Sequence, residues 1–94
     1  MMSENHPIHY RMGHVRGRLS AKQAKKVYPE KLGSAEVEED VLPYMIQYWG
    51  IFEDEFTASL RNYNLDASDP AFKAMRNGWS NGFLDEIFPL RELV

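Results

Sequence analysis

The stretch SDPAFKAMRNGWSNGFLDEIFP, residues 68–89, decides the fold that the sequence predicts. Asp69 is a favourable N-cap, Pro70 suits the first helical position, and Pro89 ends the helix. Between these signals the apolar side chains recur at steps of three and four residues, which is typical of an amphipathic helix. They are Phe72, Met75, Trp79, Phe83 and Ile87.

Two glycines, Gly78 and Gly82, lie within this helical pattern, and each costs about 1 kcal/mol relative to alanine in a helix interior. With Ala74 they are spaced four residues apart, so they form a smooth edge that a second helix backbone could approach. Gly50 and Ala58, on a long helix upstream, are candidate counterparts. The alternative is that the two Asn-Gly pairs form turns that break the helix. We favour the helix because the apolar steps continue through both glycines.

A long amphipathic helix is predicted after Ser34. Its apolar stripe again follows steps of three and four residues. The stripe comprises Val37, Val41, Met45, Tyr48 or Trp49, Phe52, Phe56 and Leu60. Pro43 predicts either a kink near 40–43 or a break there, with Pro43 as the first residue of a new helix. The stripe is wide and aromatic, so we also expect the protein to self-associate.

A short basic helix is predicted over residues 20–28, with Ser20 as its N-cap and with Pro29 and Gly33 closing it. Residues 1–13 show no clear periodicity and include Pro7 and Gly13, and residues 1–19 are expected to form a basic extended arm. Together these elements predict a single all-α domain over residues 1–94, a small bundle of about three helices. The three are the short basic helix, the long helix with Pro43, and the C-terminal helix.

The charge is distributed unevenly along the chain. The net charge is −3. Residues 1–33 carry seven Lys or Arg and two Glu, whereas residues 34–94 carry four Lys or Arg and twelve Asp or Glu. The basic segment could bind an anionic partner such as RNA or a nucleotide, or pair with acidic residues of its own chain. Its candidate binding residues are Tyr10, Arg16, Arg18, Lys22, Lys25 and Lys26.

The acidic remainder supports a different hypothesis, which we prefer. Two acidic clusters lie beside aromatic residues and could occupy a basic groove on another protein. Their members are Glu38, Glu39, Asp40, Glu53, Asp54 and Glu55. The sequence therefore predicts a protein–protein interaction module, acting as an inhibitor or adaptor, with RNA or nucleotide binding as the alternative.

Catalytic chemistry is not expected. The chain has no cysteine, and its three histidines all lie within the first fourteen residues. No Gly-rich phosphate loop or nucleophile motif is present, so we expect no enzyme activity, no metal site and no cofactor. No apolar run reaches the roughly 20 residues that span a bilayer. With no apolar signal in MMSENHPIHY, we expect a cytoplasmic protein that does not bind membranes.

Seven residues resemble the ribosome modulation factor family. They are Gly13, Gly17, Arg18, Pro70, Trp79, Gly82 and Phe83. The chain departs from that family in the roughly fifty residues between the two motifs, in Asp69 where the family has asparagine, and in its acidic balance. The resemblance covers about a quarter of the chain and adds some weight to RNA binding. In size, acidity and lack of catalytic motifs, the chain is also similar to small phage-encoded inhibitors of host or defence proteins.

Overall fold

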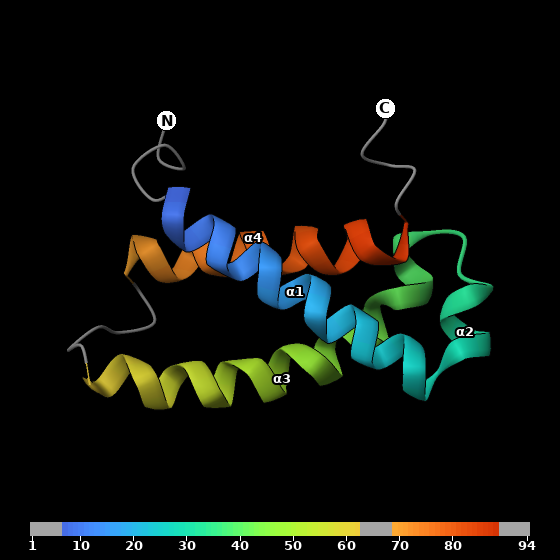
Figure 1. Ribbon diagram of the computed structural model, residues 1–94, viewed down its shortest axis with the longest axis horizontal. Helices are drawn as coiled ribbons and strands as arrows, with labels where there is room; N and C mark the ends of the chain where they lie inside the picture. Colours follow the sequence, from blue (N-terminus) through green and yellow to red (C-terminus); the bar gives the residue numbers. More distant parts are fainter. Residues whose placement is uncertain (1–6, 63–68, 89–94) are drawn as a thin grey trace.

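The computed structural model describes residues 7–62 and 69–88, and these form four α-helices (Figure 1). They are α1 (Pro7–Val27), α2 (Pro29–Gly33), α3 (Glu38–Asn62) and α4 (Pro70–Ile87). The predicted all-α bundle is confirmed for this part of the chain. The helix count differs from the expected three because α2 forms a separate short helix that begins at Pro29. The proline ring disfavours helical backbone at Tyr28, which separates α2 from α1.

The N-terminal segment is helical where the sequence predicted an extended arm. α1 begins at Pro7, so that prediction is wrong over residues 7–19, while residues 1–6 lie outside the described part. Gly13 and Gly17 are poor helix formers, so local propensity gives little reason for this helix. The helix forms because both glycines face α4, and tertiary packing supplies the stability that propensity lacks.

The backbone of α1 lies directly against that of α4. A Cβ atom added to Gly13 would overlap the carbonyl oxygen of Met75 on α4, and one added to Gly17 would overlap that of Trp79. Both neighbours are backbone atoms, which cannot rotate away as a side chain can. Only glycine therefore fits at these two positions of α1.

The glycines of α4 contact the backbone of α1 in the same way. A Cβ at Gly78 would overlap the carbonyl oxygen of Tyr10, and one at Gly82 would overlap that of His14. The smooth edge predicted on this helix is thus used, but its partner is α1. Gly50 is not its counterpart, because open space surrounds the Cβ position of Gly50. Ala58 is exposed and is not its counterpart either.

The boundaries of α4 agree with the sequence signals. The Asp69 carboxylate accepts a hydrogen bond from the backbone N–H of Ala71 at 2.8 Å, which is the expected N-cap, and Pro70 is the first helical residue. The helix runs unbroken through both glycines to Ile87, so the alternative of Asn-Gly turns is wrong. Pro89 lies outside the described residues.

α3 is one continuous helix with Pro43 inside it. The alternative of a new helix starting at Pro43 is therefore wrong. In Figure 1 the N-terminal turns of α3, behind α1, run in a different direction from the rest of the helix, as the kinked alternative requires. Val41, Met45 and Phe52 of the predicted stripe are buried, but Val37 is exposed and precedes the helix. The side chain of Leu60 is not among those described.

Aromatic rings fill the space between α3 and α4. Trp49 lies edge-on to Trp79 with ring centroids 5.3 Å apart, and Phe56 packs on Phe72 at 5.5 Å. Phe52 contacts the same cluster and is buried. The core of the bundle is therefore a layer of rings on one face of α4, while α1 covers the glycine face.

Candidate functional site

The basic segment of α1 pairs with acidic residues at the end of α4. His14 Nε2 lies 2.9 Å from a carboxylate oxygen of Asp85. The side chains of Arg18 and Lys25 both reach the Glu86 carboxylate, at 3.3 and 3.2 Å. These contacts span more than sixty residues of sequence, so they hold α1 against α4. The structure thus favours pairing within the chain for this part of the basic segment.

Glu86 is the centre of this charge cluster. Burial alone would raise the pKa of its carboxyl, but hydrogen bonds from Lys25 and Arg18, with the charges of Lys25 and Lys22, outweigh it and lower the pKa below the usual value. The carboxylate is therefore held in its ionised form. Asp85 and Glu86 were not among the predicted site residues, because nothing local distinguishes them from other surface acids.

The other candidate residues of the basic segment are divided between contacts and solvent. Arg16 reaches Glu55 on α3 at 3.6 Å, and its guanidinium lies over the Phe52 ring at 5.8 Å. Tyr10 accepts a hydrogen bond from Asn81 at 2.9 Å. Lys22 and Lys26 remain exposed. The candidate binding residues of this segment therefore differ in their surroundings, and their role in binding RNA or a nucleotide stays a prediction.

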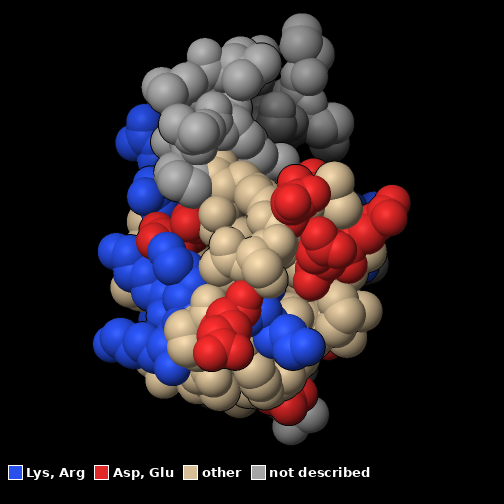
Figure 2. Space-filling view, turned by 90° about the vertical axis from the view of Figure 1, so that its right-hand side faces the viewer, with Lys and Arg blue, Asp and Glu red and all other residues tan. Residues whose placement is uncertain are grey.

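The predicted acidic residues do not form one surface. Asp40 accepts hydrogen bonds from the backbone N–H groups of Glu36 and Val37, at the start of α3. Glu53 accepts one from the Trp49 indole at 3.2 Å. Asp54 is exposed, as are Glu38 and Glu39. In Figure 2 most basic side chains lie on the left and a group of acidic ones on the right, but other acidic side chains lie beside the basic ones at the left and lower centre.

A row of apolar side chains on α1 is exposed, and sequence reasoning missed it. Relative exposures are 69% for Ile8, 48% for Met12, 56% for Val15 and 52% for Leu19. We call these four residues the α1 stripe. Their spacing of four, three and four is the seam pattern of a helix that packs on another helix. The pattern was present in the sequence but was not recognised, because residues 1–19 were interpreted as an extended arm.

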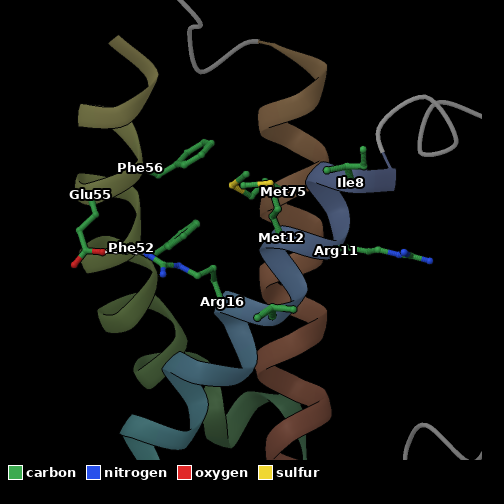
Figure 3. A pocket seen from close by; sticks show the side chains of 9 residues that line it. Ile8, Arg11, Met12, Arg16, Phe52, Glu55, Phe56 and Met75 are labelled. Atoms are coloured by element: carbon green, nitrogen blue, oxygen red, sulfur yellow. Dashed lines mark ion pairs between the residues drawn. The ribbon is translucent and has the colours of Figure 1, made fainter. Parts of the chain in front are cut away.

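A groove lies between the α1 stripe and α3 (Figure 3). Its volume is about 830 Å³. Phe52 and Phe56 project from α3 toward it, and Met75 of α4 lines it as well. A second hollow of about 330 Å³ adjoins it, shares Arg16, Phe52 and Glu55, and is bordered by Leu19 and Ile51. The two hollows make a mostly apolar trough along one side of α1.

The described residues contain no group of three or more His, Asp or Glu side chains that could hold a metal ion. Within residues 7–62 and 69–88, no helix is long and apolar enough to cross a membrane. The charged residues beside the groove, Arg11, Arg16 and Glu55, are exposed, so the trough offers shape and apolar contact with few polar groups. Such a surface can bind an apolar partner.

No protein-family model matches this chain. No curated protein and no solved structure matches it either. The residues of the ribosome modulation factor resemblance include Gly13, Gly17 and Gly82, which lie at the contact between α1 and α4. That contact explains why glycine occurs at these three positions without reference to RNA.

Proposed function

We propose that the protein is a non-catalytic interaction module that binds another protein through the α1 stripe and the adjoining groove. The observation that carries this proposal is the row of four exposed apolar side chains beside a hollow lined by Phe52 and Phe56. Fully burying an exposed apolar side chain contributes about 1.5–3 kcal/mol, and about half or more of the surface of each of these four is still exposed. An exposed apolar stripe of this kind lowers the solubility of a small domain, and a bound partner protein would remove it from water.

The apolar groove is a better candidate than the acidic clusters first considered. Glu53 and Glu55 have partners within the fold, and Asp40 caps α3. Exposed charges contribute little to affinity in isolation, but they steer association and select the partner. Asp54, Glu38 and Glu39 are accordingly assigned a supporting role. Action as an inhibitor or adaptor, self-association and a cytoplasmic location remain part of this proposal.

RNA binding is the second candidate, and one observation favours it. α1 carries six Lys or Arg residues and no Asp or Glu. Against it, Arg16, Arg18 and Lys25 contact carboxylates of the same chain. The exposed side chains between the cations are Met12, Val15, Leu19 and Gln23. None of these is aromatic, whereas single-stranded nucleic acid is usually bound by aromatic rings that stack on bases.

Site-specific crosslinking tests the proposal. A photoreactive phenylalanine analogue replaces Val15 in one variant and Lys31 of α2 in a matched control, and both are irradiated in extract from the source cells. We expect a discrete protein adduct from position 15 that survives nuclease treatment and is absent from position 31. The proposal fails if position 15 gives no protein adduct, or if its adducts disappear after nuclease treatment.

A further inference from the structure

The α1 stripe has the geometry of a helix-packing seam. At about 100° per residue, its four side chains span an arc of about 60° on the surface of α1. In heptad terms Met12 and Leu19 take one core position, and Ile8 and Val15 take the other. An apolar seam beside a trough is the arrangement that accepts the apolar face of an amphipathic helix.

The charged residues that α1 itself places beside this seam are all basic. Arg11 and Arg18 precede the core residues Met12 and Leu19, and Arg16 follows Val15, so these arginines occupy the flanking positions that select a partner in helix pairs. Figure 3 shows Arg16 directed toward α3 and Arg11 directed away from the groove. Because α1 contains no Asp or Glu, no acidic residue of this helix balances them.

We propose that the partner helix carries acidic residues on both sides of its apolar stripe. This inference rests on the proposed function and specifies the partner of the same site. Asp or Glu in the partner would face Arg11 on one side of the seam and Arg16 on the other, with apolar residues in the groove over Phe52 and Phe56. Glu55 already pairs with Arg16, so Arg11 contributes more to the selection.

A second copy of this chain fits the seam less well. Two α1 helices placed seam to seam bring Arg11, Arg16 and Arg18 of one copy against arginines of the other, in parallel or antiparallel orientation. Like charges at these positions oppose pairing, which is a common way of excluding a wrong partner. The seam therefore selects against self-association through this face of α1.

Three synthetic helical peptides test the inference. They share one Leu/Ile seam and differ only in the flanking residues, which are Glu, Lys or Gln, three residues with similar helix propensity. Their dissociation constants for the full chain are measured by fluorescence anisotropy. We expect the Glu peptide to bind at least about tenfold more tightly than the Lys peptide. This preference shrinks at high salt, where exposed charges are screened.

Variants of the protein locate the effect. Arg11→Glu should reduce the preference for the Glu peptide several-fold, while Lys31→Glu, on α2 and away from the seam, should leave it unchanged. Val15→Asp should abolish binding of all three peptides, with an unchanged circular dichroism spectrum as the check on folding.

Four results would overturn the inference. The Lys peptide could bind as tightly as the Glu peptide, or none of the peptides could bind. A single-stranded RNA could bind at the seam more tightly than the Glu peptide. Sedimentation could show a dimer that Val15→Asp dissociates. If Val15 still crosslinks to another protein in the second case, the proposed function stands and only the acidic partner helix is wrong.

Discussion

The two contacts of α4 are built on opposite principles. Against α1 it presents Gly78 and Gly82, and the two backbones touch. Against α3 it presents Phe72, Trp79 and Phe83, and rings separate the backbones. A contact between backbones has no side chain that can move to relieve an added atom, whereas a layer of rings can adjust its rotamers. Small changes should therefore be costly on the glycine face and tolerated on the aromatic face.

Gly17→Ala should have the largest effect. The added methyl group would overlap the backbone of Trp79, so the helices must separate. We expect a loss of at least about 3 kcal/mol in the free energy of unfolding, at the upper end of overpacking effects. Urea denaturation followed by circular dichroism measures it. A loss below about 1 kcal/mol would show that the backbones are not in contact.

Phe83→Leu should cost less, although it changes more atoms. Phe83 is fully buried, with its ring 5.2 Å from that of Trp79. A change between large apolar side chains usually costs less than about 1.5 kcal/mol, because neighbours repack. The same urea titration gives the value. If Phe83→Leu destabilises the protein more than Gly17→Ala, the comparison of the two faces is wrong.

Gly50→Ala is the matched control and should act in the opposite direction. Gly50 lies inside α3 with open space around its Cβ position. Alanine there should stabilise the protein by about 1 kcal/mol, because glycine is a poor helix former. The midpoint of thermal unfolding should rise. A fall would mean that α3 has a close neighbour at this position.

Glu86→Gln should have the smallest effect on the free energy of unfolding. It tests whether the ion pairs of Glu86 stabilise the contact between α1 and α4 in addition to the glycines. The pKa of Glu86 is lowered in the folded state, so its ionised form stabilises the fold above its unfolded pKa, and this contribution disappears as pH falls through the folded pKa. We expect a loss of about 0.5–1 kcal/mol at neutral pH, since the cations are partly exposed. At pH values below the folded pKa, the variant and the natural chain should be equally stable.

Local signals predicted much of α3 and α4. Asp69 and Pro70 mark the start of α4, and the apolar steps of both helices are visible within short windows. The N-terminal half of α1 was not predicted in this way, because Gly13 and Gly17 are poor helix formers and their contact with α4 is not visible in a short window. The spacing of Gly78 and Gly82 along α4 predicts a close helix contact, but it does not show which helix is the partner. The partner is α1 and not α3, which carries Gly50.

The candidate site was less predictable than the fold. The basic residues of α1 were identified, but their partners Asp85 and Glu86 lie far away in the sequence and carry no local signal. The spacing of the α1 stripe is visible in the sequence. It indicates one exposed apolar face only when residues 7–19 are known to be helical. Exposure then separates Val15, which faces solvent, from Gly13 and Gly17, which face α4.

The glycine contact also constrains the order in which the protein can fold. Gly13 and Gly17 meet residues more than sixty positions later in the chain, so this contact cannot form until the ribosome has passed residue 79. A helix with two glycines is weakly stable alone. The segment that forms α1 should therefore stay unstructured during translation and become helical when α4 has been synthesised and packs against it. Closing so long a loop slows folding, and the chain should gain its N-terminal helix and its binding seam in the same late step.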